Sequence, residues 1–157
     1  MRDLPLIRSV YLEIDTELET QRSSASANGD ADAMNRIELR QRINDQAYFV
    51  LCWGQLETAI DETCRTAIRN RRTSENWSIR RAWDLYNPDD GRLSGLRFEN
   101  RAALVLDQSA GKGSSWAKVM SYYALRNQIA HGDLQAERID VEEVVKDFFQ
   151  IQAELRT

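Results

Sequence analysis

The middle of the chain carries an apolar stripe with the spacing of a single helix face. From Ala47 onward, apolar residues recur in steps of three and four over about six turns. The stripe consists of Phe49, Val50, Trp53, Leu56, Ile60, Cys64, Ala67 and Ile68. We therefore predict one long helix from about Ala33 to Arg72. Gly54 inside it lowers helix propensity by roughly 1 kcal/mol relative to alanine, which suggests a point where another helix approaches closely.

Shorter stretches with helical periodicity flank this segment and predict further helices. They cover residues 4–22, 99–107, 115–131 and 141–155, with a short helix that Ser74 would cap and that carries Trp77, Ile79, Trp83 and Tyr86. The run 102–106 (Ala-Ala-Leu-Val-Leu) would also suit a buried strand. We favour the helix because no partner strand is evident elsewhere in the sequence.

Polar residues mark where these helices begin and end. We expect loops at 23–32 and 87–95, where small, polar and turn-forming residues gather. Ser115 and Asp140 are suited to cap the helices that follow them, and Gly132 stands where a helix commonly stops.

The length and the scarcity of helix breakers define the fold class. The chain has 157 residues with only 7 glycines and 2 prolines, which suits one domain with its own core. We predict an all-α, up-and-down bundle of about four to five main helices with short accessory helices, as a single domain over residues 1–157.

Charge and composition indicate which partners and which cellular location to expect. The formal net charge is −4, so the whole chain does not resemble a general binder of polyanions. No apolar run approaches the ~20 residues that span a membrane, and the first residues do not resemble a signal peptide. The two cysteines, Cys52 and Cys64, are too few for a disulfide framework. We expect a soluble cytoplasmic protein that does not associate with membranes.

His131 is the only histidine of the chain, which limits the chemistry that one protomer can perform. Metal sites built on two or three histidines are excluded within a single copy, and we predict neither a metal nor a cofactor. Any chemistry that needs an imidazole must use His131 or borrow one from a second chain.

The strongest local signal lies around this histidine. Asn127 and His131 are four residues apart, so they share one face of the predicted helix, and Arg126 is their neighbour. A guanidinium can hold an anionic phosphate, and an imidazole can transfer a proton near neutral pH. These side chains suit phosphodiester chemistry, although a charged helix end with a glycine stop would show the same residues.

The segment Arg126-Asn127-Gln128-Ile129-Ala130-His131 resembles the Arg-x4–6-His motif of HEPN domains, in which a polar residue such as Asn commonly follows the Arg. The long helix around 48–57 is similar to the helix that precedes the motif in many members. The resemblance covers roughly residues 40–155 and implies a helical bundle.

Many HEPN domains are metal-independent endoribonucleases that dimerise with their motifs face to face. The resemblance implies that Arg126 holds the scissile phosphate, that His131 transfers protons or contacts the phosphate, and that Asn127 orients the pair. Glu57 matches an acidic position on the long helix and is a candidate supporting residue. A homodimer would bring a second imidazole to the site. The implied role is a toxin or defence effector that acts on RNA, with a cognate antitoxin or another protein as partner.

One departure from the family pattern concerns regulation. Toxins of this family that pair with nucleotidyltransferase antitoxins often carry a tyrosine two residues after the motif histidine, and this chain has Asp133 there. Control by adenylylation at that position is therefore not expected. Other members lack catalysis and act as interaction modules, so a non-catalytic module that binds a partner protein or a nucleotide is the alternative hypothesis.

A cluster of arginines offers a candidate RNA surface. Of the 21 basic residues, 18 are arginine. Between Thr63 and Trp83 the only acid is Glu75, and the six arginines there are Arg65, Arg69, Arg71, Arg72, Arg80 and Arg81. Five of them (Arg65, Arg69, Arg72, Arg80 and Arg81) are our candidate RNA-binding residues. A solvated helix end that complements the helix dipole would explain the cluster equally well.

Three other features give weaker evidence of function. The segment Gly111-Lys112-Gly113-Ser114 lacks the upstream glycine and the Ser/Thr after Lys that a phosphate-binding loop needs, so we interpret it as a linker with a helix cap. Cys52 and Cys64 are interpreted as small buried residues rather than nucleophiles. Trp53 and Trp116 are expected in the core, whereas Trp77 and Trp83 lie in an irregular region and suit either core or surface.

Overall fold

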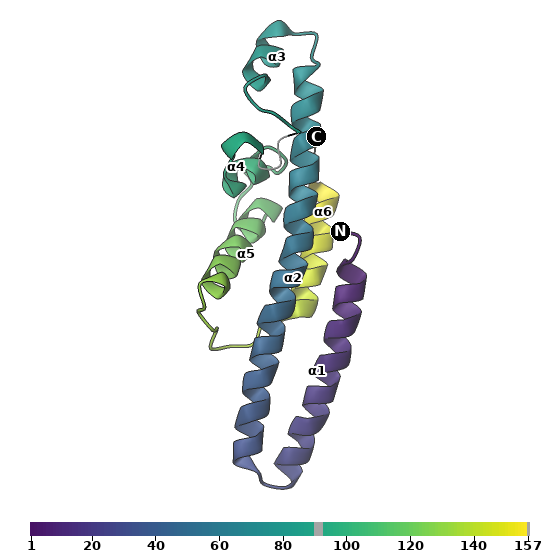
Figure 1. Ribbon diagram of the computed structural model, residues 1–157, viewed down its shortest axis with the longest axis vertical. Helices are drawn as coiled ribbons and strands as arrows, with labels where there is room; N and C mark the ends of the chain where they lie inside the picture. Colours follow the sequence, from purple (N-terminus) through teal and green to yellow (C-terminus); the bar gives the residue numbers. More distant parts are fainter. Residues whose placement is uncertain (90–92, 157) are drawn as a thin grey trace. The chain divides into compact units, whose positions relative to one another are not determined.

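The computed structural model describes residues 1–89 and 93–156, and these form helices with no strand among them (Figure 1). The prediction of an all-α fold is confirmed. The helices are α1 (Leu4–Ala27), α2 (Ala31–Arg72), α3 (Trp77–Trp83), α4 (Phe98–Ala103), α5 (Ser115–Ala130) and α6 (Val141–Glu154), with a 3₁₀ turn, η1, at Leu93–Gly95. The run 102–106 completes α4 and the turn after it, so the strand alternative is wrong. None of the described helices combines the length and apolar character needed to cross a membrane.

Contacts within the chain define two compact units. Unit 1 comprises Met1–Gln55 and Tyr123–Asp147, and unit 2 comprises Leu56–Tyr122 and the chain from Phe148 onward. Three helices, α2, α5 and α6, contribute residues to both units. The assignment of the whole chain to a single domain stays a prediction.

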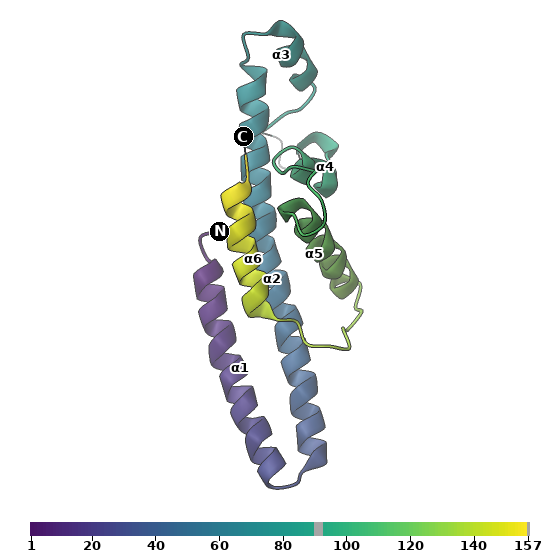
Figure 2. The same cartoon turned by 180° about the vertical axis from the view of Figure 1, so that it is seen from behind.

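In unit 1, α1 runs antiparallel to the first half of α2, as Figures 1 and 2 show from opposite sides. Leu18 and Ala25 of α1 are buried with Ile37 of α2 near the turn that joins the helices. The predicted loop at 23–32 is wrong in extent, because residues 23–27 continue α1 and α2 already begins at Ala31. Burial of Ala25 against α2 favours helix over the loop that the small, polar composition indicates.

In unit 2, the second half of α2 supplies the central apolar face. Leu56, Ile60, Cys64, Ala67 and Ile68 are all buried there. Phe98 and Ala102 of α4, Val119 of α5, and Phe148 and Ile151 of α6 complete the core of this unit. Over the entire stripe predicted from the sequence, Val50 is the one residue that is not buried, so the predicted long helix and its buried face are confirmed.

The helix ends follow the predictions in part. Asp140 caps α6 by accepting a hydrogen bond from the Glu143 N–H at 2.9 Å, as predicted. The caps of the two other helices are shifted: Asn76 rather than Ser74 caps α3, and Ser114 rather than Ser115 caps α5. The side-chain oxygen of a cap must reach the backbone N–H groups two and three residues later. Which residue meets this condition depends on the turn before the helix, and the sequence does not show that turn. Of the predicted loop 87–95, residues 90–92 lie outside the described residues, and 93–95 form η1.

Two glycines provide a matched test of this fold. A Cβ built on Gly54 meets no heavy atom within 4 Å among the described residues, so the close helix approach that we expected there is not present. Gly132, in contrast, has a positive φ of 91° at the end of α5.

We expect Gly54→Ala to raise the free energy of unfolding by about 0.5–1 kcal/mol, because alanine is the better helix former. Gly132→Ala should lower it by about 1–2 kcal/mol, because a Cβ is strained in the left-handed region. Urea unfolding followed by circular dichroism measures both, and a loss of stability in Gly54→Ala would contradict the assignment of an open helix face.

Candidate functional site

The end of α5 positions the candidate catalytic residues within unit 1. Arg126 and Asn127 lie in the last turn of α5 and are half-buried, whereas His131 follows the helix and is exposed. The Gly132 N–H donates to the Ile129 carbonyl at 3.0 Å, and the Asp133 N–H donates to the Gln128 carbonyl at 3.1 Å. This pair of bonds is a Schellman motif, which makes His131 the C-cap residue and confirms the predicted glycine stop.

The structure brings Arg126 and Asn127 into direct contact. Arg126 Nη1 donates a hydrogen bond to Asn127 Oδ1 at 3.1 Å. The backbone carbonyl of Asn127 accepts a hydrogen bond from the backbone N–H of His131 at 3.0 Å, so the two residues lie one helical turn apart. The result is a fixed guanidinium, an amide and a solvent-exposed imidazole at one helix end.

A buried ion pair fixes the chain that follows this site. The Arg138 guanidinium makes a bidentate contact with Asp45 of α2, with Nε–Oδ2 at 2.8 Å and Nη2–Oδ1 at 2.9 Å. Asp45 is fully buried, and the Tyr11 hydroxyl also donates to it at 3.0 Å. Arg138 further pairs with Asp15 of α1. The hydrogen bond to Asp45 raises the pKa of Arg138 above its ordinary value, and burial and the neighbouring carboxylates do the same for Tyr11. The loop after His131 is thus tied to α1 and to α2.

Aromatic packing supports the preceding turn of α5. Trp53 of α2 stacks on Tyr123, with ring centroids 6.0 Å apart and an interplanar angle of 29°. Trp53 is almost fully buried, as predicted. Since Tyr123 lies three residues before Arg126, the stack fixes the rotation of α5 at the motif.

Glu57 lies in unit 2, where it belongs to a charge cluster between α2 and α4. Arg101 Nη2 approaches Glu57 at 3.5 Å, and Arg101 Nη1 binds the Asp61 carboxylate at 2.6 Å. Burial raises the pKa of Asp61, a shift that the Arg101 charge partly offsets. The contacts of Glu57 therefore account for it as part of the packing of α4 on α2, and its supporting role at the motif stays a prediction.

The candidate RNA-binding arginines also lie in unit 2, and most have partners there. Arg69 pairs with Asp89 at 2.6 Å, Arg72 approaches Asp84 at 3.5 Å, and Arg65 donates to the Pro88 carbonyl at 2.6 Å. Arg80 donates to the Ser74 carbonyl at 3.3 Å, and Arg81 is exposed. These contacts fasten the segment after α2 to the end of that helix. The sequence window that predicted a basic patch ended at Trp83, just before the acids Asp84 and Asp89 that partner its arginines.

The tryptophans divide between core and surface. Trp83 lies under Arg71, whose guanidinium carbon is 5.0 Å from the ring centroid, and it contacts Tyr86. Trp77 is 62% exposed on α3. Trp116 is half-buried and lines a cavity of unit 2 rather than the centre of the core, so its predicted core position is wrong.

A basic hollow in unit 1 was missed by the sequence analysis. Arg22, Arg42 and Arg138 line a pocket of about 280 Å³ together with Glu38 and Gln41. Arg42 also donates to the Ala136 carbonyl at 3.0 Å, next to the loop that follows His131. These three arginines come from α1, α2 and the loop before α6, so no spacing in the sequence could connect them. Arg138 is paired with Asp45 and Asp15, and Arg22 with Glu38 and Glu19, so carboxylates already balance much of the positive charge in this hollow.

The cysteines are buried free thiols. Burial raises the pKa of Cys52 and of Cys64 to about 11 each. A thiol with that pKa is deprotonated to roughly one part in ten thousand at neutral pH, which suits a packing role rather than a nucleophile. Among the residues that the structure describes, no group of three or more His, Cys, Asp or Glu gathers where a metal ion could be held.

Comparison of the chain with protein-family models, with characterised proteins and with solved structures returned no match.

The Asp45–Arg138 pair offers a direct test of what holds the motif loop in place. Arg138→Met leaves the Asp45 carboxylate buried without its charge partner, and we expect a loss of about 2–3 kcal/mol in the free energy of unfolding. This is below the usual cost for a buried pair because the Arg138 side chain is 40% exposed. Adding Asp45→Asn removes the unpaired charge and should recover at least about 1 kcal/mol in urea unfolding. If the changes in unfolding free energy caused by the two substitutions simply add, Asp45 and Arg138 do not stabilise each other.

Proposed function

We propose that the chain is a metal-independent endoribonuclease of HEPN type that acts as a homodimer in the cytoplasm, with the role of a toxin or defence effector. The observation that carries the proposal is the contact of Arg126 with Asn127 one turn before the exposed His131, at a helix end closed by Gly132. The residues match the Arg-x4–6-His pattern of that family in an all-α chain.

The chemistry follows from these side chains. Arg126 would bind the non-bridging oxygens of the scissile phosphate and stabilise the charge that develops on them. The ribose 2′-OH attacks phosphorus while its proton passes to a base, and the bond from phosphorus to the 5′-oxygen breaks as that oxygen receives a proton. The products are a 2′,3′-cyclic phosphate and a 5′-OH. Asn127 holds the arginine in position through its side-chain amide.

This reaction needs both an acid and a base, and one copy of the chain has a single imidazole. A two-fold dimer that brings the ends of two α5 helices together would supply His131 twice. The exposure of His131 is compatible with such a composite site.

An apolar face of unit 1 supports the second copy as the partner. Leu39 and Ile43 of α2 are 42% and 46% exposed, and Leu134, three residues after His131, is 63% exposed. They surround a hollow of about 90 Å³ that Gln46 also lines. Gln46 is 3% exposed, and neither its amide nitrogen nor its amide oxygen has a hydrogen-bond partner within the described chain. Exposed apolar side chains around an unsatisfied amide are typical of a surface that a protein partner covers.

The arginines around the hollow of unit 1 would contact the RNA backbone if a phosphate displaced the exposed Arg22–Glu38 pair. Arg22 and Arg42 belong to unit 1, which also contains Arg126 and His131. Contacts to phosphates set the position of a nucleic acid on a protein without reading its sequence. The arginines at 65–81 remain a second candidate surface, since exposed ion pairs such as Arg69–Asp89 are weak enough for a polyanion to displace.

Cleavage of mixed RNA in the presence of EDTA tests the activity. The wild-type protein should produce fragments ending in 2′,3′-cyclic phosphate, and both His131→Ala and Arg126→Ala should reduce the rate by at least a hundredfold. Arg97→Ala, an exposed arginine of unit 2 outside the candidate RNA-binding residues, is the matched control for loss of positive charge. Equal inactivity of the wild type and His131→Ala, or a requirement for a divalent metal, would overturn the proposal.

Light scattering after size exclusion tests the composite site. We expect the wild type to elute as a dimer and Leu134→Asp to shift toward the monomer, because a carboxylate would have to be buried at the interface. Leu85→Asp is the control, since Leu85 is 80% exposed but lies in unit 2. A monomeric wild type would rule out a shared site, whatever its affinity for RNA.

A non-catalytic module that binds a partner protein, such as an antitoxin, or a nucleotide is the second candidate. The ion pairs that occupy Arg69 and Arg72 favour it, because they give those arginines a structural use without RNA. An inactive dimer that still binds a partner through the Leu39–Leu134 face would support this function instead.

A further inference from the structure

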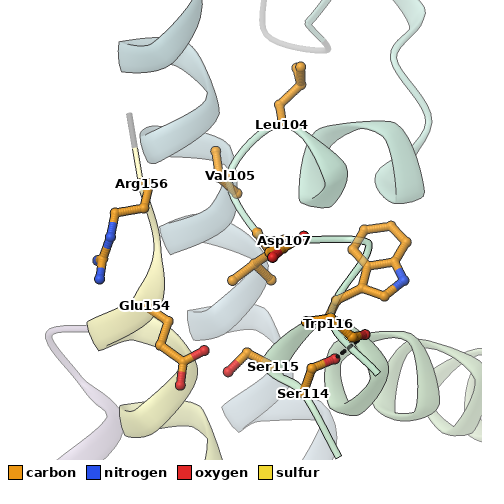
Figure 3. Close-up of a pocket in the computed structure, with 10 residues that line it drawn as sticks. Leu104, Val105, Asp107, Ser114, Ser115, Trp116, Glu154 and Arg156 are labelled. Atoms are coloured by element: carbon orange, nitrogen blue, oxygen red, sulfur yellow. Dashed lines mark hydrogen bonds between the residues drawn. The ribbon is translucent and has the colours of Figure 1, made fainter. Parts of the chain in front are cut away.

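Unit 2 contains a cavity that the proposed reaction does not use. It has a volume of about 380 Å³ and lies where the turn after α4, the first turn of α5 and the end of α6 meet (Figure 3). Leu104, Val105 and Leu106 form its apolar wall, and the polar groups come from Ser114, Ser115 and Glu154. This volume is within the range of pockets that hold small molecules, about 300–1,000 Å³.

The Ser115 side chain is the feature that calls for a ligand. Ser115 is 5% exposed, and its Oγ has no hydrogen-bond partner in the part of the chain that the structure describes. Figure 3 shows this hydroxyl directed toward Glu154 across the pocket. The Ser115 hydroxyl is the main cause of the lowered pKa of Glu154. The two groups nevertheless do not form a hydrogen bond of normal geometry. A buried polar group without a partner is rare in folded proteins and indicates a missing one.

The charges around the cavity favour a ligand that donates hydrogen bonds. The pKa of Glu154 is lowered, and the Ser109 side chain lowers that of Asp107, so both carboxylates are ionised at neutral pH. Arg156 also lines the cavity, and its charge and that of Lys118 help to lower the pKa of Glu154, while Arg156 Nη1 donates to the carbonyls of Ala153 and Leu155 at 2.9 and 3.2 Å. Figure 3 shows its guanidinium turned away from Ser115. The two carboxylates present acceptor oxygens, which require a ligand that donates hydrogen bonds.

Trp116 adds a flat surface to these acceptors. The indole is half-buried at the first turn of α5 and stands on the side of the pocket opposite Glu154 (Figure 3). An aromatic face attracts planar cations and stacks on planar heterocycles. A carboxylate accepts two parallel N–H groups in the plane of a planar donor.

We propose that this cavity binds a small planar group with two parallel N–H donors, held by the Glu154 carboxylate, by Ser115 Oγ and by the face of Trp116. A guanidinium has this chemistry with a positive charge, and the N1–N2 edge of guanine has it without charge. The proposal does not depend on the ribonuclease activity, since every residue that it uses belongs to unit 2.

Calorimetric titration of the full chain with agmatine, putrescine and guanosine tests the proposal. Agmatine differs from putrescine only by a guanidinium in place of one ammonium group, so the pair separates a planar donor from simple charge. We expect agmatine or guanosine to bind saturably and at least tenfold more tightly than putrescine. Glu154→Gln and Ser115→Ala should each weaken that binding at least fivefold. Glu143→Gln, an exposed carboxylate of α6 assigned to unit 1, is the control and should leave it unchanged.

The arms of the titration identify the ligand class or exclude it. Binding of agmatine alone assigns a cationic ligand, and binding of guanosine alone assigns a neutral one. Equal affinity for putrescine, absence of binding at millimolar concentration, or unchanged binding by Ser115→Ala would overturn the proposal. Ser115→Ala should also keep or raise the thermal midpoint, because it removes a hydroxyl that has no partner in the unliganded protein. A lower midpoint would show that the hydroxyl serves the fold and not a ligand.

Discussion

The buried carboxylate of Asp45 is the constraint on which the arrangement of unit 1 depends. A charge with no exposed surface requires a full set of partners, and Asp45 obtains them from Arg138 and from the Tyr11 hydroxyl. Those partners come from the loop before α6 and from α1, so satisfying one carboxylate brings three segments together. The loop that leaves His131 is held at its far end by this network, while His131 itself stays exposed.

Arginine performs the same connecting task throughout the chain. Arg8 of α1 pairs with Glu142 of α6 at 2.9 Å, Arg101 of α4 with Asp61 of α2 at 2.6 Å, and Arg69 with Asp89 at 2.6 Å. Each bond joins segments that are separated in sequence, and a guanidinium offers five N–H donors for such bridges, against three on a lysine ammonium. The excess of arginine over lysine therefore has a structural use in this protein, whether or not some of these side chains also contact RNA.

Local patterns predicted the helices well and their long-range contacts poorly. The stripe from Phe49 to Ile68 was sufficient to identify α2, because a helix face needs only the spacing of neighbours. The Gly132 stop and the Asp140 cap were also predictable, since both act within a few residues. The hollow formed by Arg22, Arg42 and Arg138 and the cavity beside Ser115 were not, because their residues meet only after the helices pack. The Gly54 interpretation failed for the same reason: the sequence shows a missing side chain, but only the packing shows whether another helix occupies the space.

The proposed reaction at the end of α5 would depend on an ordered helix end, because it uses few residues. A chain with one histidine cannot compensate for a misplaced imidazole with a second one of its own, so the position of that side chain must be set by the backbone. The Schellman bonds at Gly132 and Asp133 fix the backbone of His131, the Trp53–Tyr123 stack fixes the rotation of α5, and the Asp45–Arg138 pair limits the path of the following loop. Each of these constraints acts on the backbone and leaves the imidazole accessible. Exposure at the end of a constrained helix is the combination that the proposed composite site would need, since the second member of its acid–base pair would approach from outside the protomer.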